Sequence, residues 1–171
     1  MLALLKAFWD IALWRRGPGD LPGSGALLAF TAAGYSALSA MQSWLIYGTD
    51  RLLPRTLADL ALTMALVWLL LAVTGRSHRY PQTASAVLGT GALLSPLVIL
   101  LLLLKGAAAA SQIVALLVWM GSVGVILWFT FVLWHIIRSA LDTGLFTGVA
   151  IAITYVVASA AALTRLFPEG A

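Results

Sequence analysis

Five long runs of apolar residues, separated by short polar joints, dominate the pattern of the chain. They cover about residues 25–47, 57–73, 83–104, 112–137 and 145–163. A helix needs about 20 mainly apolar residues to cross a bilayer, so each run is a candidate transmembrane helix. The pattern therefore predicts an all-α fold, a polytopic membrane bundle of about five spans.

The joints between the runs divide the chain into segments. We expect an N-terminal segment 1–16, a Gly/Pro linker 17–24, a membrane domain 25–166 and a tail 167–171. Within the third run, Pro96 lacks the amide that an α-helix needs, and it is expected to kink or locally break that helix. The second run is the shortest, and Asp59 lies about one turn inside its start.

The N-terminal segment is too short to cross a bilayer, but it has the pattern of an amphipathic helix. Phe8 shares one side with other apolar residues, and Lys6 and Asp10 are spaced to form an i,i+4 pair on another. No small-residue cleavage site follows, so we expect the segment to be retained. Two interpretations stay open: a helix in the lipid headgroup layer, or a helix packed on the spans.

Composition agrees with a membrane protein. The 171 residues are 62% hydrophobic and 9% charged, and their mean hydropathy is +1.02. Those values exclude a soluble domain, which needs far more polar surface. The net charge of +4 lies in the joints between apolar runs, which indicates topology and membrane-surface contact rather than nucleic-acid binding. Since the chain has no cysteine, disulfides and thiolate chemistry are excluded.

The basic residues predict an orientation. With a cytoplasmic N-terminus and five spans, the inner segments carry Lys6, Arg15, Arg16, Arg76, Arg79 and Arg138. The outer segments then carry Arg51, Arg55, Lys105 and Arg165. Because lysine and arginine favour the cytoplasmic side, we expect a multi-pass protein of the inner membrane with a cytoplasmic N-terminus and a periplasmic C-terminus.

The search for catalytic chemistry is negative. His78 and His135 have no partner at metal-ligand spacing, and no phosphate loop or pair of catalytic carboxylates is found. The sequence thus predicts no catalytic residue, metal or cofactor, and no enzyme. Asp59 is interpreted as a structural charge neutralised by Arg51 and Arg55, with a transport role as the alternative.

A polar cluster ends the fourth run. Arg138 and Asp142 are four residues apart and could pair if the helix continues, His135 lies one turn earlier, and Asp142 could also be the N-cap of the last span. The cluster could bind a lipid headgroup or a partner, or simply end the helix. The candidate lipid or partner contacts of the whole chain are Arg15, Arg16, Arg76, Arg79, His135, Arg138 and Asp142.

Small residues recur at four-residue spacing inside the runs, for example Ser85 with Gly89 and Gly91 with Ser95. Such spacing lets helices approach closely. We interpret these faces as intramolecular packing, and a dimer or partner interface is the alternative.

The order of parts resembles the Yip-domain family of small membrane proteins. The resemblance covers about residues 21–163 and is carried by the end of the fourth run (131–137), the following residues 138–142, and the entry 148–150 into the alanine-rich last run. It implies five spans with a cytoplasmic N-terminus, and it transfers no active residue. Eukaryotic members are associated with Rab GTPases and vesicle traffic, but residue usage here is typical of a high-GC bacterium, where those partners are absent.

Two classes of function follow. We expect a non-enzymatic, Yip-like accessory or organising protein of the bacterial inner membrane that acts through membrane lipids and a membrane-protein partner or a second copy of itself. The alternative is a small-molecule transport component, such as the substrate-binding membrane subunit of an uptake system. A membrane-embedded lipid enzyme ranks third, because it would require paired acids, histidines or a metal site.

Overall fold

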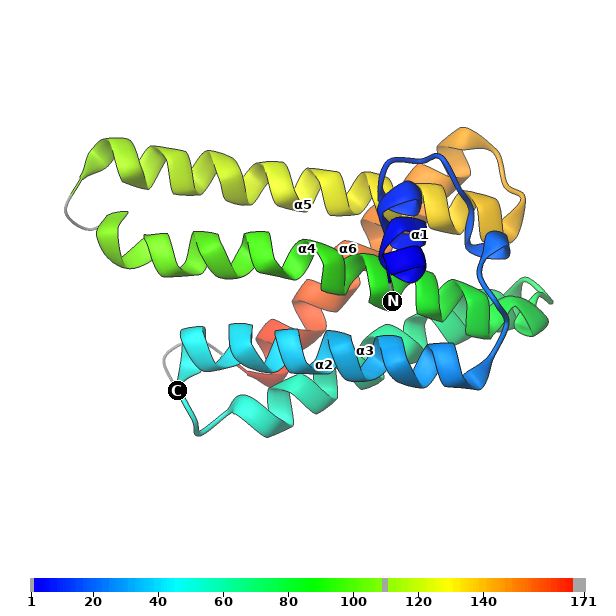
Figure 1. Ribbon diagram of the computed structural model, residues 1–171, viewed down its shortest axis with the longest axis horizontal. Coiled ribbons are helices and arrows are strands. Elements are labelled where there is room, and N and C mark those ends of the chain that lie inside the picture. The colour runs from blue at the N-terminus through cyan, green and yellow to red at the C-terminus, as the bar shows by residue number, and fades with distance from the viewer. Residues whose placement is uncertain (1, 109–110, 168–171) are drawn as a thin grey trace.

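The computed structural model describes residues 2–108 and 111–167, and no strand occurs in those two ranges. The fold is all-α, as the apolar pattern predicts (Figure 1). The elements are α1 (Leu2–Ala12), the 3₁₀ helix η1 (Pro18–Asp20), α2 (Gly25–Tyr47), α3 (Leu52–Val73), the 3₁₀ helix η2 (Ser77–Arg79), α4 (Tyr80–Ala108), α5 (Gln112–Leu141) and α6 (Leu145–Leu166).

Four stretches of helix in the described residues are long and apolar enough to cross a membrane: Leu52–Val73, Ser77–Gly106, Gln112–Leu141 and Leu145–Leu166. They are compatible with the predicted multi-pass membrane protein. The helix α2 has the length of a span but is less apolar, because it carries polar residues such as Thr31, Ser39 and Ser43. These three side chains are buried inside the bundle.

The helix bounds differ from the predicted runs in ways that sterics explain. Helix α3 begins at Leu52 rather than near 57, since Pro54 falls in its first turn, where a missing amide costs no helical hydrogen bond. Helix α4 is not broken at Pro96. It packs against both α2 and α5, and a proline is tolerated in a transmembrane helix with such neighbours. The predicted tail 167–171 lies outside the described residues except for Phe167.

Helix α4 is the centre of the bundle and contacts α1, α2, α3 and α5. Its first half is built of small residues that are almost completely buried, among them Ala84, Ser85 and Thr90. Small side chains let neighbouring helices approach closely where lipid provides no hydrophobic driving force. The small-residue face around Ser85 and Gly89 is therefore an intramolecular packing surface, as expected.

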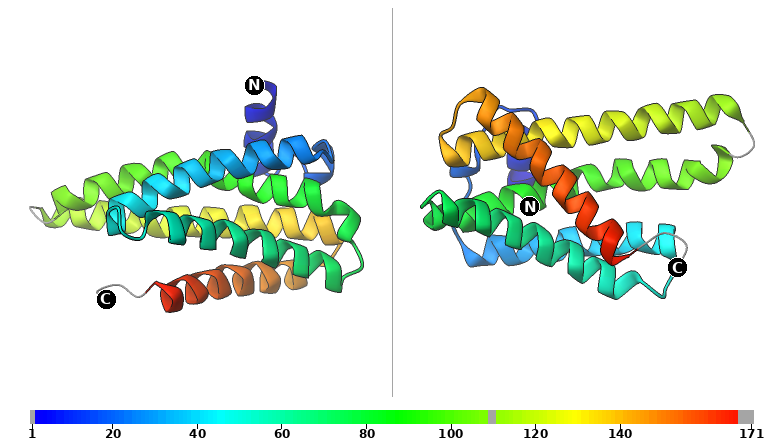
Figure 2. Two further views of the ribbon diagram at one scale, coloured as in Figure 1. Left: turned by 90° about the horizontal axis from the view of Figure 1, so that it is seen from below. Right: turned by 180° about the vertical axis from the view of Figure 1, so that it is seen from behind.

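Helix α1 runs across the direction of the long helices (Figure 2, left). One side of it packs on α4 and α5 through Phe8, Ile11 and Ala12, which are buried. The other side leaves Leu5 and Trp9 exposed. The first segment is thus packed on the long helices on one side and has an exposed apolar side as well.

Candidate functional site

Two arginines meet the last turn of α5 at one end of the bundle. Arg76 and Arg79 both donate from Nη1 to Asp142 Oδ2, at 2.7 and 3.2 Å. The same nitrogens donate to the carbonyl oxygen of Ala140, at 3.3 and 2.9 Å. We call Arg76, Arg79, Asp142 and this carbonyl the α5-end cluster. The last carbonyls of a helix have no partner inside the helix and carry its negative dipole end, so two cations here stabilise the α5 terminus.

The predicted cluster at the end of the fourth run includes Asp142, but the two roles predicted for this residue, a pair with Arg138 and the N-cap of the last span, are wrong. Its partners are Arg76 and Arg79, and Arg138 instead lies with its guanidinium carbon 5.7 Å from the centre of the Trp134 ring. Asp142 is the C-cap of α5 in a left-handed conformation with φ of 45°, and Gly144 is the N-cap of α6. The helix ends before residue 142, so the i,i+4 geometry that the spacing suggested does not form.

The N-terminal segment is held to the bundle by side chains that donate to its backbone. Trp128 Nε1 donates to the Ala12 carbonyl at 3.2 Å, and His135 Nε2 lies 2.8 Å from the Arg16 carbonyl. Because a carbonyl can only accept, His135 donates this bond from Nε2. These bonds satisfy carbonyls at and just after the end of α1, and His135 therefore has a structural partner that spacing alone could not indicate.

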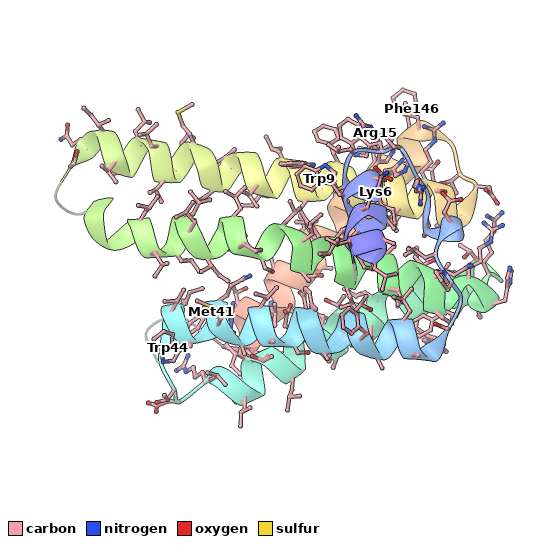
Figure 3. The ribbon with its side chains drawn as sticks, viewed as in Figure 1. Lys6, Trp9, Arg15, Met41, Trp44 and Phe146 are labelled. Carbon is pink, nitrogen blue, oxygen red and sulfur yellow. The ribbon has the colours of Figure 1, made fainter. Side chains whose placement is uncertain are left out.

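The remaining predicted contacts lie on the surface. Arg16 pairs with Asp10, with Nε 3.4 Å from Oδ2, so the expected pair between Lys6 and Asp10 is not formed. Lys6, Trp9 and Arg15 are exposed and lie on the same part of the molecule (Figure 3). This surface combines cations and an indole beside the docked helix α1, and Trp9 packs edge-on against Trp128 in the middle part of α5.

A second polar cluster lies inside the bundle. Asp59 of α3 accepts two hydrogen bonds from α2 at Oδ2, one from Tyr35 Oη and one from Ser39 Oγ, both at 2.8 Å. Thr63 and Tyr155 lie close by, and the Tyr155 hydroxyl is buried. We call Tyr35, Ser39 and Asp59 the Asp59 site.

Asp59 lies further into its helix than the predicted run 57–73 implied. Helix α3 starts at Leu52, so Asp59 lies about 10 Å along its axis, at about 1.5 Å per residue. Among the described residues the ion pairs involve Asp10 and Asp142 but not Asp59. The guanidinium carbon of Arg55 lies 4.4 Å from the centre of the Tyr47 ring instead. The available signal was the pair Tyr35 and Ser39, four residues apart on a helix otherwise rich in alanine.

A cavity of about 230 Å³ adjoins the Asp59 site. It lies between α2, α4, α5 and α6, and we call it the central cavity. Tyr35 and Ser39 line it and also contact Asp59, so these two residues lie between the cavity and the carboxylate. The other lining residues are mainly apolar, with the polar exceptions Gln42 and Ser95.

The two clusters offer hydrogen bonds and charges. Within residues 2–108 and 111–167, no group of three or more His, Asp or Glu side chains is placed to hold a metal ion.

No family model, curated protein or solved structure matches the chain.

Proposed function

We propose that this chain is a non-enzymatic, multi-pass inner-membrane protein of Yip-like type that acts as an accessory or organising protein through lipids and partner proteins. The observation that supports the proposal is the placement of α1. Helix α1 is docked across the bundle with Trp9, Lys6 and the nearby Arg15 exposed. An exposed indole beside exposed cations suits the boundary between acyl chains and anionic headgroups.

The proposed topology has five spans, with α2 as the first. Helix α2 packs along α3 and α4, both of which are long and apolar enough to span, so α2 would cross with them. Its polar side chains Thr31 and Ser39 are buried, whereas Phe30 and Met41 are exposed to the surroundings. A span with an inward polar side and an outward apolar side keeps its polar groups away from lipid.

The proposed orientation places the α1 end in the cytoplasm and the C-terminus in the periplasm. The end of the bundle nearer to α1 carries the α5-end cluster, with Arg15 on the same side (Figure 3), whereas the last turns of α4 and α6, which carry Lys105 and Arg165, lie toward the other end (Figure 1). Exposed aromatic side chains occur toward both ends, with Phe146 at one and Trp44 at the other (Figure 3). Such paired belts are typical of the two interfaces of a membrane.

The test is lipid binding by the full chain in a neutral detergent, with phosphatidylglycerol compared with phosphatidylcholine. We expect a preference for phosphatidylglycerol that weakens about tenfold or more in the double variant Lys6→Gln with Arg15→Gln, since each cation near an anionic surface contributes about 1 kcal/mol.

The matched control is Lys105→Gln with Arg165→Gln, which removes two exposed cations from the opposite end. It should leave the preference unchanged. Equal losses in the two double variants, or no preference for the anionic lipid in the unmodified protein, would contradict a lipid-contacting α1 end.

The alternative function, a small-molecule transport component, is favoured by one separate observation. The Asp59 carboxylate, two hydroxyls and the central cavity lie together inside the bundle. An ionisable residue within a membrane segment marks a substrate or ion pathway by default.

A further inference from the structure

The Asp59 site differs from the α5-end cluster and from the bonds at the end of α1, because it provides no hydrogen bond to a backbone group at a helix end. Tyr35 and Ser39 lie within α2, and Asp59 lies within α3, where backbone groups are already paired along the helix. The contact joins three side chains and no backbone group. The buried hydroxyl of Tyr155 lies close to Thr63 and to the same carboxylate. Because these contacts cap no helix, the needs of a helix end do not explain the polar residues gathered here.

The hydrogen bonds determine what kind of partner fits the central cavity. An ionised carboxylate only accepts, so the hydroxyl hydrogens of Tyr35 and Ser39 both point at Asp59. The hydroxyl of Ser95 donates to the Gly91 carbonyl at 2.9 Å. Tyr35, Ser39 and Ser95 are among the residues that line the cavity, and each of their hydroxyls has its hydrogen already committed. What they can present to a molecule in the cavity is therefore oxygen lone pairs, which select a hydrogen-bond donor.

The negative charge of Asp59 favours a hydrogen-bond donor that is a cation. A carboxylate away from water is costly unless an opposite charge compensates it, and hydroxyl donors supply only part of that compensation. No ion pair in the described residues reaches Asp59. A positively charged donor held by the hydroxyl oxygens would be separated from the carboxylate only by Tyr35 and Ser39, whose hydroxyls donate to it.

The apolar part of the cavity wall favours a cation that carries an alkyl chain. Val125, Phe129 and Val156 are among the residues that complete the lining. A bare inorganic ion would leave this apolar wall without contacts, whereas an alkyl chain would cover it. At about 230 Å³ the cavity is smaller than the roughly 300–1,000 Å³ typical of drug-sized ligands. The occupant should therefore be small.

We propose that the Asp59 site and the central cavity bind a small organic primary ammonium ion. Its ammonium group donates to the oxygens of Tyr35, Ser39 and Ser95, and its alkyl chain contacts the apolar wall. This site is independent of the lipid contacts of α1, and it goes beyond the accessory role proposed above.

The experiment uses the full chain in a neutral detergent and butylammonium chloride as the probe. Binding is measured as the rise in the thermal unfolding midpoint and by calorimetric titration. We expect butylammonium to stabilise the protein, with 1-butanol and sodium chloride at equal concentrations giving no comparable rise. The alcohol has the same chain without the charge, and the salt supplies a cation without the chain.

The decisive variant is Asp59→Asn, which keeps the shape of the side chain and removes its charge. We expect butylammonium affinity to fall about tenfold to a hundredfold, the range for the loss of one charged hydrogen-bonding partner. Should this variant fail to fold, Ser39→Ala removes one acceptor from the cavity wall and should weaken binding in the same direction. Asp142→Asn, which removes a carboxylate at the α5 end, should leave butylammonium affinity unchanged.

Four outcomes would overturn the proposal. Equal stabilisation by butanol would make the cavity merely apolar, and equal stabilisation by sodium chloride would make the site one for inorganic cations. Absence of any shift with butylammonium would show that the cavity has no such ligand. Undiminished affinity in both Asp59→Asn and Ser39→Ala would place the binding elsewhere.

Discussion

The α5-end cluster and the Asp59 site both centre on an aspartate, yet the two carboxylates have different surroundings. Asp142 is 61% exposed at its side chain and pairs with two arginines that also bind helix-end carbonyls. Asp59 lies within a helix and is held by two hydroxyls. Helix ends need partners for their free carbonyls, and that need explains the polar residues around Asp142. No helix end lies at Asp59, so helix capping does not explain its polar neighbours. We therefore attribute these neighbours to the binding of a ligand.

Like the α5-end cluster, the docking of α1 includes side chains that donate to carbonyls at a helix end. A variant that disturbs this docking should have the largest effect on stability. A methyl group added at Gly89 would lie 2.3 Å from the Phe8 ring, which is far inside contact distance. Gly89→Ala should therefore displace Phe8 and lower the unfolding free energy by about 2 kcal/mol, in the range of overpacked cores. The measurement is chemical unfolding in detergent, together with the protease sensitivity of residues 2–16.

Gly124→Ala is the matched control, because a methyl group there meets nothing within 4 Å. It should be close to neutral and leave the N-terminal segment protected. Equal behaviour of the two variants would show that Phe8 does not dock against α4.

The coupling between Tyr35 and Asp59 gives the next largest effect. A double-mutant cycle with Tyr35→Phe and Asp59→Asn should report about 1 to 2 kcal/mol, as expected for a charged hydrogen bond inside a membrane bundle. Because the site is away from bulk water, salt should leave the value unchanged. A coupling that disappears in high salt would mean that Asp59 is solvated and that its contact with α2 is a surface contact.

The coupling between Arg79 and Asp142 is expected to be the smallest. A cycle with Arg79→Gln and Asp142→Asn should report about 0.5 to 1 kcal/mol, since both side chains are partly exposed and water competes with the pair. Raising the salt concentration should reduce it further. A value larger than that of the Tyr35–Asp59 cycle, or one that salt does not change, would reverse the comparison between the two regions.

The expected scale of all these effects follows from the environment of each group. Opposite charges at a wet helix end gain little over their contacts with water, whereas groups inside the bundle have no such alternative. The same contrast explains why Arg76 and Arg79 are used at the end of α5, while hydroxyls from α2 approach Asp59.

How much of the fold could be predicted depends on whether the cause is local. The apolar runs predicted an all-α membrane bundle and the positions of its long helices, because the length of an apolar stretch and its helical hydrogen bonding are properties of neighbouring residues. The bounds were less well predicted. The start of α3 before Pro54 and the continuity of α4 through Pro96 depend on first-turn geometry and on neighbouring helices.

The sequence by itself determined the fold class, the membrane setting and the residues with polar chemistry to offer, since these follow from composition and from spacing along one helix. Only the tertiary structure decided their partners: Arg76 and Arg79 for Asp142, the Arg16 carbonyl for His135, and the hydroxyls of Tyr35 and Ser39 for Asp59. These partners come from different helices or joints and are separated by 20 to 119 positions in the chain. Spacing along one helix predicts contacts within about one turn, but a contact between helices depends on how they pack, which no single helix encodes.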